Sequence, residues 1–206
     1  MTDNPLIYGL VLSGGYSSRM GNEKSNICYY GKPHSIHTAD LISEFCDKTF
    51  LSYRKSQKGI PNPDYPIICD TYDNIGPMSG LLSAMELHPT VAWLLMACDM
   101  PYIDKETISH LIDQRNGDLD STSYWQQSED GSYTYPEPLI SIYEPKLFDD
   151  MITATHNGSY SLSKLLRQAS VKKLNIKEPY KLQSVNTPEE MEIAKKHISI
   201  NQKNHS

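Results

Sequence analysis

Residues 6–24 read LIYGLVLSGGYSSRMGNEK and open with a largely apolar run that is typical of a buried β-strand. Gly14 and Gly15 follow that run; they carry no Cβ and allow positive φ, so backbone N–H groups can approach an anion closely. Arg19 and Lys24 come next, and both side chains bind phosphate oxygens well. The stretch therefore predicts a strand followed by a turn that binds a nucleoside triphosphate.

A glycine pair after a strand often forms only a turn. Here Arg19, Gly21 and Lys24 follow the pair at short intervals, and this arrangement favours phosphate binding. The pattern is neither the G-x-x-x-x-G-K-[ST] of P-loop proteins nor a regular G-x-G-x-x-G. It resembles the signature L-x-G-G-x-x-x-R-M-G-x-x-K of nucleotidyltransferases that share the fold of the sugar-nucleotide pyrophosphorylases. Ser13 stands where this family usually has alanine, and Glu23 where it usually has aspartate.

The length of 206 residues is enough for one substantial domain, which we expect to span residues 1–206. A net charge of −6 provides no overall basic field for nucleic acid, and no segment approaches the ~20 apolar residues of a membrane span. The polar N-terminus lacks a signal-peptide pattern. None of the four cysteines has C-x-x-C spacing, so we expect free thiols. Together these features predict a cytoplasmic monomer that acts on neither nucleic acid nor membranes.

Strand-like and helix-like segments alternate along the first half of the chain. Strands are predicted at 49–53, 67–69 and 91–97, and helices at 36–45, 81–87 and 104–115. The run 91–97 is the most apolar and indicates a central parallel strand that is buried on both faces. This alternation predicts a parallel sheet with right-handed crossovers. The expected fold is therefore a single-domain α/β, Rossmann-like three-layer sandwich with a mostly parallel sheet, similar to the nucleotide-diphospho-sugar transferases.

The second half of the chain is less regular. Strands are predicted at 122–125, 138–143, 171–176 and 182–185, with helices at 146–154 and 161–169 and a hairpin or loop at 126–135. The last helix has a clear start, because Thr187, Pro188 and Glu190 match a capping box with proline at the first helical position. Residues 199–206 are predicted to be a frayed polar tail.

Three predicted strands are followed by residues that could bind a ligand: the glycine pair, Asp70 and Asp99. In open parallel sheets, ligands bind beyond the carboxyl ends of the strands. Asp99 could hold Mg²⁺, which prefers oxygen ligands and phosphates, or it could only cap the turn at Pro101. It resembles the acidic metal-binding motif that follows the same strand in the nucleotidyltransferases, and this similarity favours the metal.

Residues 76–80, GPMSG, resemble the G-P-L-A-G loop of the same proteins, although a simple loop into a helix would look alike. In those nucleotidyltransferases of this family that use GTP, an acidic residue shortly before this loop binds the guanine edge. Asp70 matches that position, and Asp73 is a rival because the intervening length varies. A carboxylate that accepts two N–H bonds would select guanine over adenine.

Three later segments also resemble the family. Residues 138–143, PLISIY, are similar to P-L-x-A-L-Y, residues 159–166 are similar to S-L-x-x-L-L, and residues 185–190, VNTPEE, match V-N-T-P-E-E/D closely. Asn186 could cap the following helix, but relatives place an Asn or Asp near this point as a second metal ligand. Over residues 6–195 the chain is most similar to the molybdenum cofactor guanylyltransferases.

This resemblance implies a Mg²⁺-dependent enzyme that transfers GMP from GTP to molybdopterin and releases pyrophosphate. It implies Arg19, Lys24 and Asp99 as catalytic residues, and Asp99 and Asn186 as metal ligands. The nucleotide-binding residues that it implies are Leu12, Ser13, Gly14, Gly15, Lys24, Asp70, Gly76, Pro77, Gly80 and Asp99. Cofactor-insertion proteins or acceptor apoenzymes are possible further partners.

Two other functions fit the same motifs. The chain could be a related transferase that uses CTP or a sugar-phosphate acceptor, or a catalytically silent nucleotide-binding module in cofactor delivery. The acceptor side matches the family poorly, and the candidate cations there are Lys164, Arg167, Lys172 and Lys173. The aromatic residues of the loop 124–135 could stack on a pterin or simply pack.

Overall fold

The computed structural model describes residues 4–13, 27–54, 64–128 and 130–204, with side chains described up to residue 200. Within these residues, seven strands form one sheet in the order β3-β2-β1-β4-β6-β5-β7. The strands are β1 (Ile7–Leu12), β2 (Lys48–Tyr53), β3 (Ile67–Cys69), β4 (Ala92–Ala97), β5 (Ser121–Gln127), β6 (Thr134–Tyr143) and β7 (Val171–Asn175). No helix of this described part is long and apolar enough to cross a membrane.

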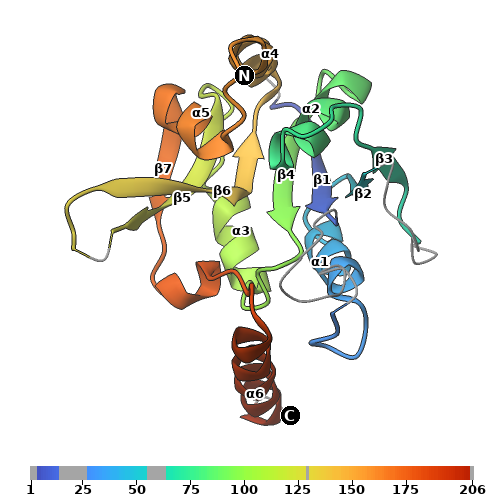
Figure 1. Ribbon diagram of the computed structural model, residues 1–206, viewed down its shortest axis with the longest axis vertical. Helices are drawn as coiled ribbons and strands as arrows, with labels where there is room; N and C mark the ends of the chain where they lie inside the picture. Colours follow the sequence, from blue (N-terminus) through green and yellow to red (C-terminus); the bar gives the residue numbers. More distant parts are fainter. Residues whose placement is uncertain (1–3, 14–26, 55–63, 129, 205–206) are drawn as a thin grey trace.

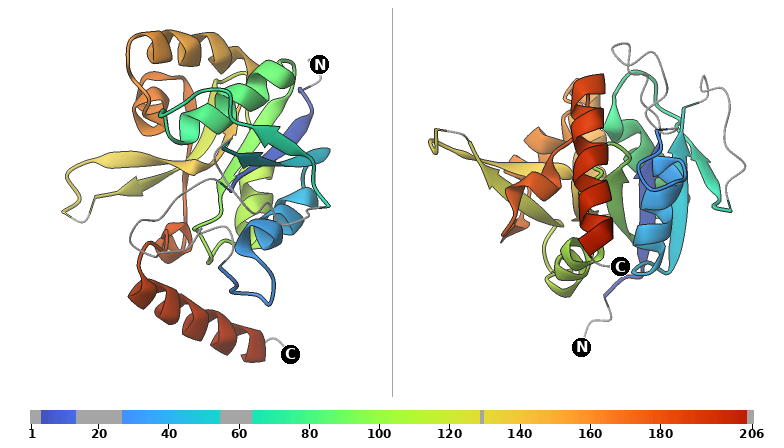
Figure 2. Two further views of the ribbon diagram at one scale, coloured as in Figure 1. Left: turned by 45° about the vertical axis from the view of Figure 1, so that its right-hand side comes forward. Right: turned by 90° about the horizontal axis from the view of Figure 1, so that it is seen from below.

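The sheet is mostly parallel, with one reversed strand. β1, β2, β3 and β4 pair in parallel, as do β5 and β7, whereas β6 is antiparallel to both of its neighbours. The carboxyl ends of β1 and β4 point toward the last helix (Figure 1). The hairpin of β5 and β6 extends away from the rest of the sheet in both views of Figure 2.

Helices cover both faces of the sheet and complete three layers. One apolar cluster joins the sheet to α1 (His34–Ser43) and α3 (Lys105–Asp113). A second cluster joins the other face to α2 (Pro77–Leu87), α4 (Phe148–His156) and α5 (Leu162–Gln168). Short 3₁₀ helices η2 (Pro145–Leu147) and η3 (Pro179–Leu182) precede α4 and α6 (Pro188–Asn204). The three-layer α/β fold that the sequence predicts is confirmed.

β4 is the centre of the core. All six of its residues are buried, as expected for a strand between two helical layers. It pairs in parallel with β1 on one side only, because its other neighbour is the reversed strand β6. β4 therefore joins the parallel half of the sheet to the reversed strand β6.

Three predicted segment boundaries are wrong. The helix predicted from Leu81 begins at Pro77, because Gly76 adopts φ 62° and proline is favoured at the first helical position. The strand predicted at 182–185 is instead the end of η3 and an irregular segment, since the Val185 N–H bonds a loop carbonyl rather than a strand. The predicted tail is helical up to Asn204, because burial of Ala194 and Ile198 anchors α6.

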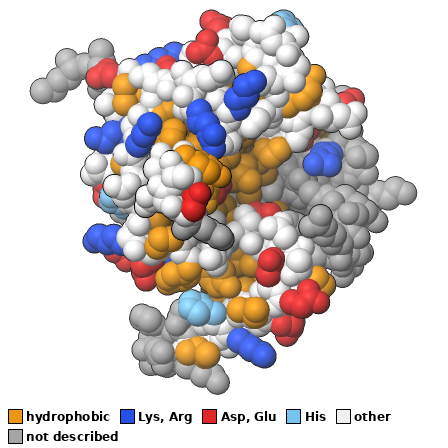
Figure 3. Space-filling view, turned by 60° about the vertical axis from the view of Figure 1, so that its left-hand side comes forward, with side chains coloured by type: hydrophobic (Ala, Val, Ile, Leu, Met, Phe, Trp, Pro, Cys, Tyr) orange, Lys and Arg blue, Asp and Glu red, His pale blue; other side chains and the backbone are white. Residues whose placement is uncertain are grey.

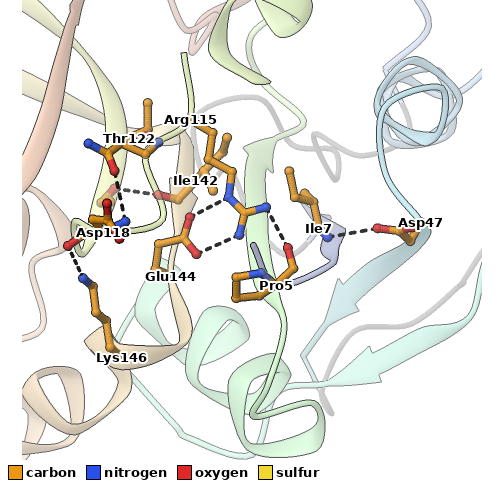
Figure 4. Close-up of polar contacts among 11 residues, drawn as sticks. Pro5, Ile7, Asp47, Arg115, Asp118, Thr122, Ile142, Glu144 and Lys146 are labelled. Atoms are coloured by element: carbon orange, nitrogen blue, oxygen red, sulfur yellow. Dashed lines mark hydrogen bonds and ion pairs between the residues drawn. The ribbon is translucent and has the colours of Figure 1, made fainter. Parts of the chain in front are cut away.

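A buried ion pair fixes the edge of the sheet where β1 begins. The Arg115 guanidinium donates to both carboxylate oxygens of Glu144, at 2.6 and 2.8 Å, and also to the Pro5 carbonyl at 2.7 Å (Figure 4). The two charged side chains are only 7% and 1% exposed. The pair ties the segment before β1 to the end of β6 and lies at the opposite edge from the candidate site.

Two stacked histidines at the start of α1 predict a loss of stability in acid. Burial is the main reason that the pKa of His34 falls to about 3 and that of His37 to about 4. Because the unfolded-state pKa is about 6.5, the unfolded chain takes up protons first as the pH falls. Stability is therefore lost from about pH 6.5 downward, by about 2 kcal/mol at pH 5 for the fully buried His34.

Thermal melts between pH 8 and pH 5 test this expectation. The melting temperature of the wild type should fall more steeply than that of a His34→Gln/His37→Gln variant. His156→Gln, at an exposed position in the last turn of α4, should follow the wild type. Equal slopes for the wild type and the double variant would show that the two buried rings do not control acid stability.

Candidate functional site

A pocket lies where the ends of β1, β2 and β3 meet the start of α2. Its lining residues come from four separate segments and are Leu12, Ser52, Arg54, Asp70, Gly76, Pro77 and Gly80. The structure thus brings together five residues that the sequence predicts to bind the nucleotide. This position at the carboxyl edge of a parallel sheet is where such folds bind ligands.

Close approach of α2 to the sheet explains the glycine at position 80. A Cβ on Gly80 would lie 2.4 Å from the Ser52 Oγ and 2.8 Å from the Leu12 Cδ2. Any larger side chain would therefore push α2 away from β1 and β2. Gly76 has a different reason to be glycine, because it takes a positive φ as the residue before the helix. Both glycines shape the wall of the pocket through the backbone.

Asp70 is held in this pocket by β2. The Ser52 Oγ donates a 2.6 Å hydrogen bond to its Oδ1, and its own N–H donates to the Tyr53 carbonyl at 2.8 Å. Burial raises the pKa of the Asp70 carboxyl, while the Ser52 bond and the nearby Arg54 act in the opposite direction. The carboxylate is therefore partly desolvated and fixed in orientation.

Asp73 occupies a different position. Its side chain is exposed and lines an adjoining pocket together with Asn74 and Ser79. Arg54, Asp70 and Gly76 line both pockets. It does not line the pocket that contains Leu12 and Gly80. Of the two candidate guanine readers, the geometry thus favours Asp70.

Asp99 and Asn186 are brought together by a backbone contact. The Val185 N–H donates a 2.8 Å hydrogen bond to the Asp99 carbonyl, which joins the end of β4 to the start of α6. The predicted capping box is present, because the Glu190 N–H donates to the Thr187 Oγ1 and the Thr187 N–H donates to the Glu190 carboxylate. The capping side chain is therefore that of Thr187, not that of Asn186.

These residues fit Mg²⁺ as part of a ligand set. Within residues 4–13, 27–54, 64–128 and 130–204, no three His, Cys, Asp or Glu residues converge as a complete metal site. Protein sites for Mg²⁺ commonly supply one or two carboxylates and leave the other positions to water and substrate phosphates. Asp99 with Asn186 matches that type of site. Asp99 lies in the turn that follows β4, and the predicted cap of α3 by Asp104 is present.

The segment predicted to bind phosphate lies outside the described residues. Gly14, Gly15, Arg19 and Lys24 all fall there, and their predicted roles stay predictions. Ser13 is described and buried, and its N–H donates to the Ser52 carbonyl at 3.1 Å. The β1–β2 pairing therefore continues up to the start of that segment.

Glu137 is a carboxylate near Asp99 that sequence reasoning missed. Burial raises its pKa to about 7, and the charge of Asp99 is a further cause. Its Oε1 accepts a bond from the Leu139 N–H, and its Oε2 accepts one from the Gln126 side chain. It lies in β6 directly before the segment 138–143, which the sequence predicts to be a strand. A carboxylate next to such a strand was the available signal.

Cations and aromatic rings meet around the β5–β6 hairpin. The Lys173 Nζ lies 3.9 Å from the centre of the Trp125 ring, and the Arg167 guanidinium lies 6.0 Å from that of Tyr133. Lys164 and Lys172 are exposed on the neighbouring α5 and β7. Figure 3 views the molecule from this side and shows Lys and Arg side chains gathered beside an apolar hollow. The four candidate acceptor cations thus lie on α5 and on the edge strand β7.

Comparison with known proteins agrees with the geometry. Residues 9–173 match the model of the MobA-like NTP transferase domain. The molybdenum cofactor biosynthesis bifunctional protein of Synechocystis sp. is 36% identical over 89% of this chain, and the chain spans 52% of that protein. The molybdenum cofactor guanylyltransferase of Pseudomonas entomophila is 27% identical over 90% of this chain and 96% of its own length.

The similarity extends to solved structures. Molybdopterin-guanine dinucleotide biosynthesis protein A from Archaeoglobus fulgidus superposes with a TM-score of 0.76 at 23% identity, covering 93% of this chain and 98% of the other. A 4-diphosphocytidyl-2C-methyl-D-erythritol synthase from Anaerococcus prevotii superposes with a TM-score of 0.68 at 14% identity, covering 96% of this chain and 100% of the other. At this identity the comparison shows a shared fold alone. With its family model matched over most of its length, the chain belongs to the MobA-like NTP transferase domain family, a family of nucleotidyltransferases.

Proposed function

We propose that this chain transfers GMP from GTP to the terminal phosphate of molybdopterin in a Mg²⁺-dependent reaction. The observation that carries the proposal is the fixed, buried Asp70 carboxylate in the pocket beside Gly76, Pro77 and Gly80. The names of relatives in Synechocystis and Pseudomonas support the acceptor.

The Asp70 carboxylate selects the base. Guanine presents two neighbouring donors, N1–H and the 2-amino group, and an ionised carboxylate can accept from both. Adenine has an acceptor at N1 and no 2-amino group, so the carboxylate oxygen that Ser52 does not contact would lack a donor. A buried polar group without a partner costs about 1–3 kcal/mol, so the pocket favours GTP. Leu12 and Pro77 contribute apolar contacts to the ring.

In the reaction, an oxygen of the acceptor phosphate forms a bond to the α-phosphorus of GTP. The bond from that phosphorus to the bridging oxygen breaks, and pyrophosphate leaves with its electron pair. Asp99 and Asn186 would hold Mg²⁺, which supplies charge neutralisation at the phosphates when bound. Arg19 and Lys24 are proposed to bind the same phosphates. The role of the chain is therefore to position the reactants and to stabilise developing charge.

Substitution of Asp70 tests the base pocket. Asp70→Ala should weaken GTP binding by about ten- to a hundredfold, which corresponds to the loss of one charge-assisted contact. Asp73→Ala is the matched control and should bind GTP like the wild type. Isothermal titration with GTP, CTP and ATP, with Mg²⁺ and without acceptor, measures the effect. A larger loss for Asp73→Ala than for Asp70→Ala would show that the guanine reader is misassigned.

A further inference from the structure

A break in strand pairing surrounds Glu137. Ser123 of β5 pairs with Ser141 of β6, but Trp125 pairs with Pro136. A step of two residues along β5 therefore corresponds to a step of five residues along β6. This β-bulge contains Glu137 and Pro138. Bulges change the direction of a side chain and occur often beside active sites.

Buried hydroxyl groups hold the bulge in place. The Ser141 Oγ lies 2.7 Å from the Glu137 carbonyl oxygen and 2.7 Å from the Ser123 Oγ. The Ser123 Oγ lies 3.1 Å from the Tyr124 carbonyl oxygen and 3.3 Å from that of Glu137. The Tyr143 hydroxyl donates to the Pro138 carbonyl at 2.8 Å. All three donors are fully buried. Buried hydroxyls are costly unless they are hydrogen-bonded, so these three groups have a defined role: they fix the backbone that carries Glu137.

The pairing of β4 with β6 leads Glu137 toward the turn that contains Asp99. Met96 of β4 pairs with Ile140 of β6 in antiparallel register. Continued past the end of β4, that register brings Glu137 opposite Asp99. The influence of the Asp99 charge on Glu137 agrees with this placement. The two carboxylates thus lie at the same edge of the sheet, Glu137 in β6 and Asp99 in the turn that follows β4.

The order of the strands separates the base pocket from Glu137. The pocket around Asp70 lies over β1, β2 and β3, Asp99 follows β4, and Glu137 belongs to β6 on the far side of β4. A nucleotide that places its base at Asp70 and its α-phosphate at Asp99 leaves the β6 side for the second substrate. In an in-line displacement that substrate approaches opposite the departing pyrophosphate.

We propose that Glu137 is a specificity-determining residue for the acceptor, whose carboxylate accepts hydrogen bonds from N–H groups of the pterin. This inference rests on the proposed function. A carboxylate repels the triphosphate but matches the N–H donors of a pterin ring. Trp125, whose strand neighbour Pro136 precedes Glu137, and Tyr133 provide aromatic surface on the same hairpin, and Arg167 and Lys173 provide positive charge for the acceptor phosphate.

Equilibrium binding of molybdopterin, measured by quenching of tryptophan fluorescence, tests this role without turnover. Glu137→Gln keeps the shape of the side chain but removes its charge, and should raise the Kd for molybdopterin by about ten- to a hundredfold. Glu137→Asp keeps the charge and should bind molybdopterin more tightly than Glu137→Gln. Glu192→Gln, on the exposed surface of α6, is the control and should match the wild type. The Kd for GTP with Mg²⁺, measured by calorimetry, should stay within about twofold in all variants.

The possible results separate this inference from the proposed function. Equal molybdopterin affinity in Glu137→Gln and the wild type, no binding by the wild type, or an equal loss of GTP affinity would each overturn the role of Glu137. A wild-type protein that binds molybdopterin through Glu137 but releases no pyrophosphate from GTP would support the role of Glu137 and reject the guanylyltransferase assignment. Thermal melts of each variant identify any general loss of structure.

Discussion

Asp99→Asn is expected to abolish Mg²⁺-dependent nucleotidyl transfer while the protein keeps its fold. The substitution preserves the shape of the side chain and removes the charge that would hold the metal at the end of β4. Loss of a charge-stabilising group at a reacting phosphate should lower kcat by at least about a hundredfold. Little stability should be lost, because the change also removes a negative charge that acts on the nearby Glu137 carboxyl.

Pyrophosphate release measured against Mg²⁺ concentration, together with a thermal melt, provides the test. Asn186→Ala should have a milder effect, since a neutral ligand contributes less and water can replace it. It should not weaken the start of α6, because the Thr187 side chain provides the cap. If Asp99→Asn retained the Mg²⁺ dependence of the wild type, Asp99 would be a turn residue and the metal would bind elsewhere.

Glu144→Gln should give the largest loss of stability among the substitutions considered. It leaves the Arg115 guanidinium buried without a counter-charge, and breaking a buried ion pair in this way costs about 3–5 kcal/mol. Arg115→Met/Glu144→Leu, which removes both charges, should lose less than Glu144→Gln, since no unpaired charge remains. Activity per folded molecule should not change, because the pair lies at the opposite edge of the sheet from Asp70 and Asp99.

Urea unfolding at pH 7 measures these differences. The matched control is the exposed Glu192–Lys195 pair on α6, where Glu192→Gln should cost less than about 1 kcal/mol. A loss in Glu144→Gln no larger than that of this surface control would contradict the stabilising role of the Arg115–Glu144 pair.

The sequence predicted correctly those structural features that depend only on residues close together in the chain. The apolar run of β4, the capping box of Thr187 and Glu190, and the Asp104 cap of α3 are all present because each depends on residues close in the chain. The α6 boundary was missed since it depends on burial of Ala194 and Ile198 against the rest of the molecule.

The candidate site was only partly predictable for the same reason. The choice between Asp70 and Asp73 depends on Ser52, a residue of another strand that orients the Asp70 carboxylate. Glu137 was missed because the bulge that positions it arises from pairing between β5 and β6, including a contact from Ser123 on the other strand. Such register information is not contained in any short motif.

The most direct test of the proposed function is pyrophosphate release by the purified protein with Mg²⁺, molybdopterin and either GTP or CTP. The account predicts release that requires molybdopterin and is much faster with GTP than with CTP, and a molybdopterin product that carries GMP. Preference for CTP, or pyrophosphate release with GTP that does not depend on molybdopterin, would contradict it.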